Sequence, residues 1–218
     1  MSRLRLAFRY FAHVTLRVVL PVLTKLEIRG RENIPPYGPL IVAFNHLSHA
    51  DAFLMIATMP YSFEAIALTD LLSVPGTGQV LRAYGVIPVH RDQVDREVIR
   101  HALQVLQEGG VLALAPEARR SVTGALERAR PGAAYLALQS GAPVMPVAIT
   151  GTDRILTDLK HLCRPRLTVT FGIPFTLSHL GGDGRSRREQ RIEAIDEIMI
   201  RIARMLPTEY RGEYGERV

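Results

Sequence analysis

The chain has 218 residues, of which 47% are hydrophobic, and this combination excludes a disordered chain and predicts one well-packed domain. A single cysteine, Cys163, excludes an internal disulfide and favours a reducing compartment. The net charge is +6, and residues 1–31 alone carry seven bases and one acid, so the positive charge belongs to the N-terminal segment. Basic residues elsewhere do not alternate with aromatic ones, and no nucleic-acid partner is expected.

Residues 1–24 predict a basic amphipathic helix. Arg5, Arg9, His13 and Arg17 recur every fourth residue on an otherwise apolar segment. The arginines interrupt any apolar run long enough for a membrane-spanning helix or a signal peptide. A cationic stripe on an apolar body suits an anionic membrane surface, so we expect a peripheral, monotopic helix on the cytoplasmic face of a membrane. The alternative is a helix packed on its own domain with solvated arginines. Pro21 is expected to kink or end it.

The rest of the chain, residues 25–218, alternates predicted strands with predicted helices. This alternation indicates a single α/β domain with a mostly parallel central sheet flanked by helices. The expected strands are Leu26–Arg29, Leu40–Phe44, Phe63–Leu68, Val86–Val89, Val111–Leu114, Val144–Ile149 and Leu167–Phe171. The expected helices are Ala52–Met59, Gln79–Tyr84, Val94–Glu108, Gly132–Gln139 and a closing helix whose apolar face runs from Ile192 to Leu206. Pro88 argues against a central position for its strand.

Ionisable side chains follow three of these strands. His46 comes after Leu40–Phe44, His90-Arg91 after Val86–Val89, and Glu117 shortly after Val111–Leu114. Ligands of parallel α/β sheets bind outside the carboxyl ends of the strands. If these strands are neighbours, a histidine, an arginine and a glutamate converge there.

The stretch "FNHLSHADAF" offers an acid–base pair. His46 and Asp51 are five residues apart, so a turn would let the carboxylate reach one imidazole nitrogen and leave the other free to accept a proton. Such a pair would activate an alcohol for attack on an acyl carbonyl. Two alternatives are that Asp51 merely caps the following helix, and that His46, His49 and Asp51 bind a metal.

Arginines lie beside two of the strand ends. The stretch "APEARRS" holds Glu117, Arg120 and Ser121, and "GVIPVHR" ends in Arg91. The planar fork of a guanidinium matches phosphate, although a solvated, charged loop would contain the same residues.

Four stretches together resemble the glycerolipid acyltransferase family, which includes the lysophosphatidic acid acyltransferases. "NHLSHAD" resembles the family's N-H-x-x-x-x-D block, which contains the HX4D motif, and "GVIPVHR" resembles its second block. "APEARRS" resembles the third, usually F-P-E-G-T-R-S, and "APVMPVAI" the fourth. All four occur in family order over roughly residues 25–175. The third block departs from the pattern at Ala115, Ala118 and Arg119, and Ala118 replaces a glycine whose backbone turn can need a positive φ.

The resemblance implies an O-acyltransferase of phospholipid biosynthesis. It would move a fatty acyl group from acyl-CoA or acyl-carrier protein to a lysophospholipid hydroxyl, with 1-acylglycerol-3-phosphate as the first choice of acceptor. His46 would be the general base and Asp51 would orient it, without a metal or cofactor. The residues expected to bind substrate are Asn45, Arg91, Glu117, Arg120 and Ser121. Another lysolipid acceptor, a metal-dependent hydrolase and a non-catalytic lipid-binding protein stay open as alternatives.

Overall fold

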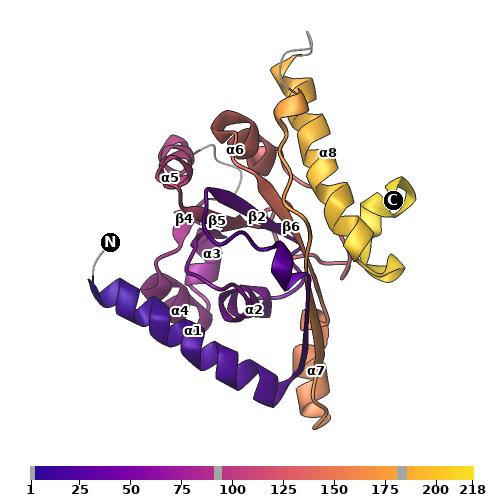
Figure 1. Ribbon diagram of the computed structural model, residues 1–218. Coiled ribbons are helices and arrows are strands. Elements are labelled where there is room, and N and C mark those ends of the chain that lie inside the picture. Colours follow the sequence, from indigo (N-terminus) through magenta and orange to yellow (C-terminus); the bar gives the residue numbers. More distant parts are fainter. Residues whose placement is uncertain (1–2, 91–94, 181–185) are drawn as a thin grey trace.

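A seven-stranded sheet forms the centre of the molecule (Figure 1). The structure, a computed structural model, describes residues 3–90, 95–180 and 186–218. The order of the strands is β1-β7-β6-β2-β5-β3-β4. Their bounds are β1 Lys25–Arg29, β2 Leu40–Phe44, β3 Glu64–Leu68, β4 Ile87–Val89, β5 Val111–Leu114, β6 Val144–Thr150 and β7 Arg166–Phe171.

The sheet is mostly parallel, as the sequence predicted. Every neighbouring pair of strands is parallel except β6 and β7, which run antiparallel from Val147 opposite Phe171 to Thr150 opposite Thr168. The strands β2 and β5 are neighbours, and so are β2 and β6. Three chain segments that follow these strands therefore leave the sheet at one edge. Pro88 lies in β4 at the end of the sheet, where no further strand requires its missing N–H.

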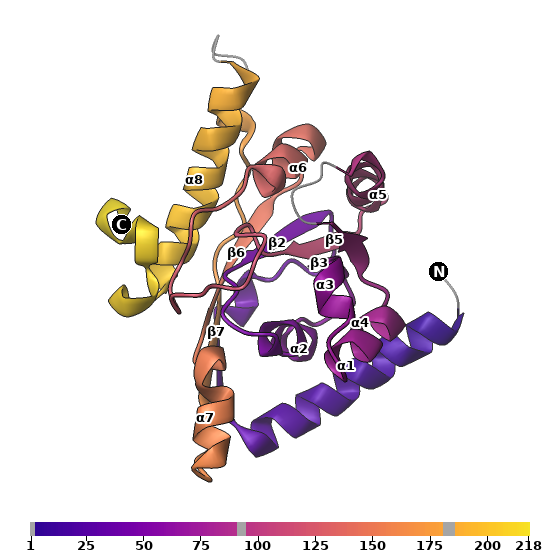
Figure 2. The same cartoon turned by 180° about the vertical axis from the view of Figure 1, so that it is seen from behind.

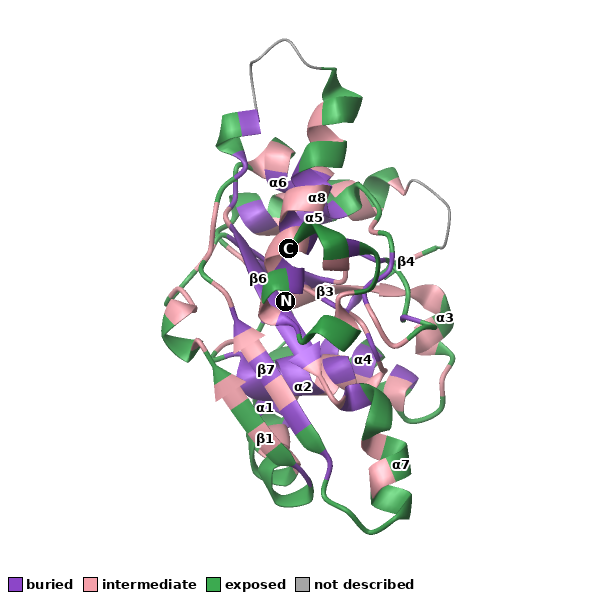
Figure 3. Cartoon of the chain, turned by 90° about the vertical axis from the view of Figure 1, so that its right-hand side faces the viewer, coloured by how far each residue is buried: buried purple, intermediate pink, exposed green. Residues whose placement is uncertain are grey.

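Helices cover both faces of the sheet (Figures 1 and 2). Alternate side chains of β2 point to opposite faces: Leu40 and Val42 pack with the helices at residues 3–23, 50–58 and 77–84, and Ile41 and Ala43 pack with those at residues 96–107, 132–140 and 187–205. The buried residues concentrate in the sheet and on the inner sides of these helices (Figure 3). The α-helices are α1 Arg3–Leu23, α2 Ala50–Thr58, α3 Thr69–Leu72, α4 Thr77–Tyr84, α5 Arg96–Gln107, α6 Gly132–Ser140, α7 Ile155–Lys160 and α8 Arg187–Met205. The shorter 3-10 helices are η1 Arg31–Asn33, η2 Thr152–Arg154, η3 Ser178–Leu180, η4 Thr208–Tyr210 and η5 Gly212–Arg217.

The polar stripe of α1 faces the domain, which neither interpretation of the sequence predicted. Arg9 is 2% exposed, and its two terminal nitrogens donate to the carboxylate of Glu64 at 2.8 and 2.9 Å. His13 is buried against the hydroxyl of Tyr84, with 3.3 Å between Nε2 and Oη. Arg17 donates to the carbonyls of Ala57 and Met59 that end α2. The domain thus supplies a carboxylate and free helix-end carbonyls that hold the cationic side chains inward.

The opposite face of α1 is apolar and exposed. Its exposed large hydrophobic residues are Leu4, Leu6, Tyr10, Phe11, Val14, Val18, Val19, Val22 and Leu23. We expected no spanning helix, yet within the described residues α1 is long and apolar enough to cross a membrane, with a mean hydropathy of 1.4 over its best window. The two criteria differ: the mean hydropathy of a window stays high despite two interior arginines, whereas our prediction required a run without charged residues. Signal sequences and buried helices meet the same criterion, so it does not decide the role of α1.

Candidate active site

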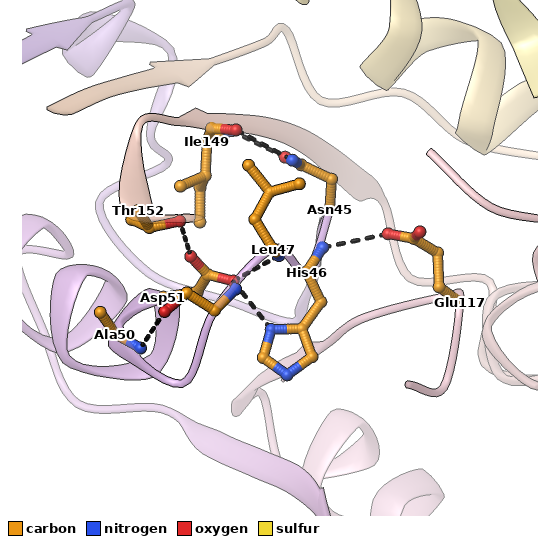
Figure 4. A network of polar contacts seen from close by, with 9 residues as sticks. Asn45, His46, Leu47, Ala50, Asp51, Glu117, Ile149 and Thr152 are labelled. Carbon is orange, nitrogen blue, oxygen red and sulfur yellow. Dashed lines mark hydrogen bonds and ion pairs between the residues drawn. The ribbon is translucent and has the colours of Figure 1, made fainter. Parts of the chain in front are cut away.

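The turn between β2 and α2 brings an imidazole and a carboxylate together (Figure 4). The apolar strand β2 ends at Phe44, and α2 starts six residues later at Ala50. This short connection lets Asp51, in the first turn of α2, reach back to the strand end. The distance from Nδ1 of His46 to Oδ2 of Asp51 is 2.8 Å. The predicted pair is therefore present at the carboxyl edge of the sheet.

The Asp51 carboxylate is fully buried and has several hydrogen-bond donors. Its Oδ2 also accepts the backbone N–H groups of Leu47, at 2.7 Å, and Ser48, at 2.8 Å. These donors compensate the removal of the charge from water. The N-cap position of α2 is His49, and the side chain of Asp51 bonds the turn before the helix. The geometry thus favours an orienting role for Asp51 over the simple helix cap.

The second imidazole nitrogen of His46 is free to react. If Nδ1 carries the proton and donates to Asp51, Nε2 has a lone pair. Figure 4 shows Nε2 on the side of the ring away from the carboxylate, and it has no hydrogen-bond partner within residues 3–90, 95–180 and 186–218. The side chain is 18% exposed. A hydroxyl group that reaches Nε2 can therefore give up its proton there.

Thr152 completes this network and was not predicted. Its hydroxyl donates to Oδ1 of Asp51 at 2.5 Å, and the residue is 2% exposed. It follows β6 after Gly151, which has φ 85°, and a Cβ at Gly151 would lie 2.0 Å from the carbonyl oxygen of Arg166. The rule that located His46 and Glu117, a polar residue just past a strand of the sheet, applies equally to Thr152.

Glu117 connects the loop after β5 to the same turn. Its Oε1 accepts the backbone N–H of His46 at 3.0 Å, and its Oε2 accepts the N–H of Glu127 at 2.8 Å. The residue is 2% exposed, and this burial raises the pKa of its carboxyl to about 7. The predicted convergence of His46 and Glu117 is present. Both carboxylate oxygens therefore hold the backbone on either side of the site in place.

Asn45, a predicted substrate-binding residue, also forms hydrogen bonds with the backbone. It is 1% exposed, its amide nitrogen donates to the carbonyl of Ile149 at 2.9 Å, and its amide oxygen accepts the N–H of Ile149 at 2.7 Å. Two hydrogen bonds to one residue fix the end of β2 against the end of β6. They thereby hold His46 near Thr152.

The remaining predicted binding residues differ in their positions. Arg120 is exposed on the loop after β5, and its charge helps to lower the pKa of His49. Ser121 is buried, where its hydroxyl donates to the carbonyl of Ala125 at 2.7 Å and its N–H donates to the carbonyl of His46 at 2.8 Å. Ser121 is thus placed to shape the loop. Arg91 lies outside the described residues.

Comparison with known proteins identifies the family. A family model described as Acyltransferase matches residues 25–150, which is more than half of the chain. The chain belongs to the Acyltransferase family.

Several relatives of this acyltransferase chain carry the same name, 1-acyl-sn-glycerol-3-phosphate acyltransferase. The Brassica napus chloroplast protein is 28% identical over 161 residues, or 71% of this chain and 46% of that protein. The Borreliella burgdorferi protein is 30% identical over 59% of this chain and 52% of its own length. The human alpha protein is 28% identical over 58% of this chain and 46% of its own length. The chain spans about half the length of these relatives.

A solved structure shows the same fold. The crystal structure of the 1-acyl-sn-glycerophosphate acyltransferase from Thermotoga maritima aligns with a TM-score of 0.65. The alignment covers 91% of this chain and 81% of that chain at 22% identity. At this identity the likeness supports the α/β architecture and no more.

The third acyltransferase block has an unusual backbone. Ala118, which stands where the resembled pattern has glycine, has φ 53°, a left-handed conformation that residues with a Cβ rarely adopt. Its N–H donates to the carbonyl of Ala115 at 3.0 Å, so the turn is formed despite the alanine. Arg119 pairs with the carboxylate of Glu127. The departures therefore keep the glycine-type turn and direct Arg119 to a partner in the loop.

The metal alternative has little support in this geometry. The residues described contain no group of three or more His, Cys, Asp or Glu side chains arranged to hold a metal ion. Both Asp51 oxygens already accept hydrogen bonds. Nδ1 of His49 is buried without a partner, and burial, then the charges of Arg120 and His46, lower the pKa of His49. His49 therefore tends to be neutral beside the pair without joining it.

Proposed function

We propose that this protein transfers a fatty acyl group from a thioester donor, acyl-CoA or acyl-carrier protein, to the hydroxyl of a lysophospholipid. The proposed acceptor is 1-acylglycerol-3-phosphate, as in the names of the relatives, and the proposed pathway is phospholipid biosynthesis. One observation carries the proposal: in a chain of the Acyltransferase family, His46 is held 2.8 Å from a buried carboxylate and offers a free Nε2. This is the arrangement of a general base.

In the proposed reaction His46 acts twice. Nε2 removes the proton of the acceptor hydroxyl as its oxygen forms a bond to the thioester carbonyl carbon. The tetrahedral intermediate then breaks its carbon–sulfur bond, and the departing thiolate takes the proton from the imidazolium, giving a free thiol and an ester. Asp51 keeps the imidazole oriented and stabilises its positive charge. The acyl group thus moves from sulfur to the acceptor oxygen. The proton moves from the acceptor hydroxyl, through His46, to the departing thiolate.

The acceptor phosphate is proposed to lie beside Arg120. Arg120 is exposed on the loop that follows β5, so its guanidinium is accessible for a charge-assisted contact to a phosphate. Arg91 follows β4 in sequence and is proposed as a second phosphate ligand. Glu117 and Asn45 would act indirectly, by fixing the backbone on either side of His46.

The protein is proposed to lie on the cytoplasmic face of a membrane without crossing it. Arg9 and Arg17 bind the domain, so the outer face of α1 is left mainly apolar between Leu4 and Leu23. An exposed apolar face of this size is unfavourable in water and favourable in the interfacial region of a bilayer. This position would bring the site to the surface where lysophospholipids reside.

Purified protein with acyl-CoA and 1-acylglycerol-3-phosphate tests the function. Release of free CoA thiol and formation of the diacyl product by mass spectrometry are expected for the wild type. His46→Ala and Asp51→Asn should each abolish both signals while circular dichroism shows the native fold. His179→Ala, at an exposed histidine paired with Glu197 on α8, is the control and should retain both. Full thiol release by His46→Ala would refute the proposed general base, and the absence of transfer by the wild type to any lysophospholipid would favour a non-catalytic lipid-binding protein.

A further inference from the structure

Helix α7 and the turn after it expose three leucines. Leu156 is 74% exposed, Leu159 41% and Leu162 95%, whereas Ile155 packs on the core. Leu156 and Leu159 are three residues apart and therefore lie on one face of the helix. Nothing in the proposed reaction uses these side chains, and the described chain leaves most of Leu156 and Leu162 uncovered.

Leu162 occupies a position that normally requires glycine. Its φ is 55°, and the backbone forms a Schellman turn: Cys163 N–H donates to the carbonyl of Asp158 at 2.9 Å and Leu162 N–H to that of Leu159 at 3.0 Å. A leucine here is unfavourable twice in water, because its Cβ disfavours the left-handed conformation and its side chain is almost fully hydrated. Burial of that side chain in an apolar medium would offset both costs.

The α7 turn is fixed next to the end of α1. Nη2 of Arg164 donates to the carbonyls of Pro21, at 2.6 Å, and Thr24, at 2.7 Å. Val22 and Leu23, at this end of α1, are 67% and 49% exposed. Figures 1 and 2 both place α7 beside the C-terminal end of α1, at the same end of the molecule. The exposed leucines therefore lie at the end of the molecule where the apolar outer face of α1 also ends.

Basic residues flank the leucines in sequence. Residues 154–166 contain four bases and one acid, a net charge of +3 with histidine neutral. The bases are Arg154, Lys160, Arg164 and Arg166, and all four are exposed. Exposed apolar side chains with exposed bases nearby in sequence match a bilayer with anionic headgroups, in which the leucines reach the acyl region and bases such as Lys160 stay at the phosphates.

We propose that the turn at residues 156–164 inserts into an anionic lipid surface and forms, with α1, a two-part membrane contact. It rests on the proposed function only in that both place the protein at a membrane, and it requires no acyl transfer. Two separate contacts fix the orientation of the domain on the membrane, which one helix alone would leave free to roll about its axis. The proposed anionic surface is a lipid bilayer, and contact with a second protein copy is an outcome that the experiment below distinguishes.

A single tryptophan can report on this contact, because the chain has none. Leu162→Trp should show a blue-shifted emission on addition of vesicles containing phosphatidylglycerol, and quenching by lipids brominated on the acyl chains. The matched control is Ile173→Trp, at a residue that is 72% exposed after the far end of β7 and should show neither effect. No shift at position 162, an equal shift at both positions, or a shift that follows protein concentration without vesicles would overturn the proposal.

Two further substitutions separate membrane binding from folding. Leu162→Gly should raise the melting temperature in solution, because glycine accepts the positive φ, and yet weaken partitioning onto anionic vesicles about tenfold. Leu162→Ser should weaken partitioning similarly without raising the melting temperature, and Ile173→Ser should change partitioning little. Unchanged partitioning of both position-162 variants would refute the inserted leucine. If the wild-type protein binds vesicles but transfers no acyl group, the proposed function is refuted and the proposed membrane contact is not.

Discussion

The oxygens of Asp51 are held by different kinds of donor. Oδ2 accepts two backbone N–H groups and the imidazole of His46, all within the turn before α2. Oδ1 accepts the hydroxyl of Thr152, which comes from the end of β6, 101 residues later in the chain. The backbone donors hold the carboxylate near His46, and Thr152 sets its rotation. Thr152 is therefore a positioning residue that acts through Asp51.

Thr152→Val tests this role because it preserves shape and removes the hydroxyl. A hydrogen bond to a charged group contributes about 1.5–3 kcal/mol, which corresponds to a roughly 10- to 100-fold lower kcat if that energy orients the base. We expect the KM for the acyl donor to change little. Thr152→Ser should recover most of kcat, since serine has the same donor. Equal loss in the serine and valine variants, or loss confined to KM, would show that the hydroxyl does not act through the pair.

Ala118 has backbone strain that one substitution removes. Ala118→Gly should raise the free energy of unfolding by about 1 kcal/mol, because an alanine at φ 53° has a left-handed backbone that glycine adopts at little cost. Denaturant unfolding with an unchanged slope measures this gain. Gly132→Ala, at a helix start where an added Cβ meets nothing within 4 Å, tests that the gain is specific to the positive φ. No increase in stability for Ala118→Gly would indicate that the turn is unstrained.

At the scale of elements, continuous apolar runs were sufficient to predict the central strands. Leu40–Phe44 and Val111–Leu114 match β2 and β5, because strands covered on both faces have no polar positions to blur their ends. The same strand ends located His46, Asp51 and Glu117. The sequence did not predict which face of α1 packs on the domain, because that packing depends on Glu64, which is 55 residues from Arg9. The antiparallel pairing of β7 with β6 likewise depends on how the folded chain brings the two strands together, which the pattern within either strand does not reveal.

The packing of α1 on the domain through Arg9, His13 and Arg17 is expected to weaken in acid. Burial first, then the charges of Arg17 and Arg9, lower the pKa of His13 to about 4, below its ordinary value of 6.5. The folded state thus binds fewer protons than the unfolded state between pH 4 and 6.5, and stability falls as the pH drops through this window. The loss attributable to His13 is at most about 3 kcal/mol.

Comparison with His13→Gln isolates this effect. Glutamine does not titrate and can still reach the hydroxyl of Tyr84, so the variant should lose less stability than the wild type between pH 6.5 and 4. Denaturant unfolding at several pH values measures the difference between the two slopes. Other groups, including Glu117 with its raised pKa, are present in both proteins and cancel. Parallel stability curves would show that His13 is already solvated in the folded state.

At the scale of the whole molecule, α1 turns its polar side toward the domain and exposes an apolar side to the surroundings. Arg9 and Arg17 bind the domain, and the apolar outer face of α1 ends beside α7 at one end of the fold. Residues 32–218 carry equal numbers of bases and acids, so they have no net attraction to an anionic membrane. The exposed bases near α7 attract anionic headgroups locally. Membrane affinity is therefore expected to depend mainly on apolar area and less on ionic strength.

Substitution on the outer face of α1 tests that balance. Phe11 and Val18 are 64% and 62% exposed, so Phe11→Ser with Val18→Ser should leave the fold intact and weaken partitioning onto anionic vesicles by about tenfold or more. Raising the salt concentration should weaken wild-type partitioning less than this double change does. Thiol release with a short-chain, water-soluble acceptor should be retained, because His46 and Asp51 are untouched. If the variant loses turnover with the soluble acceptor while remaining folded, α1 shapes the site itself, and if it partitions like the wild type, the apolar face of α1 does not meet the bilayer.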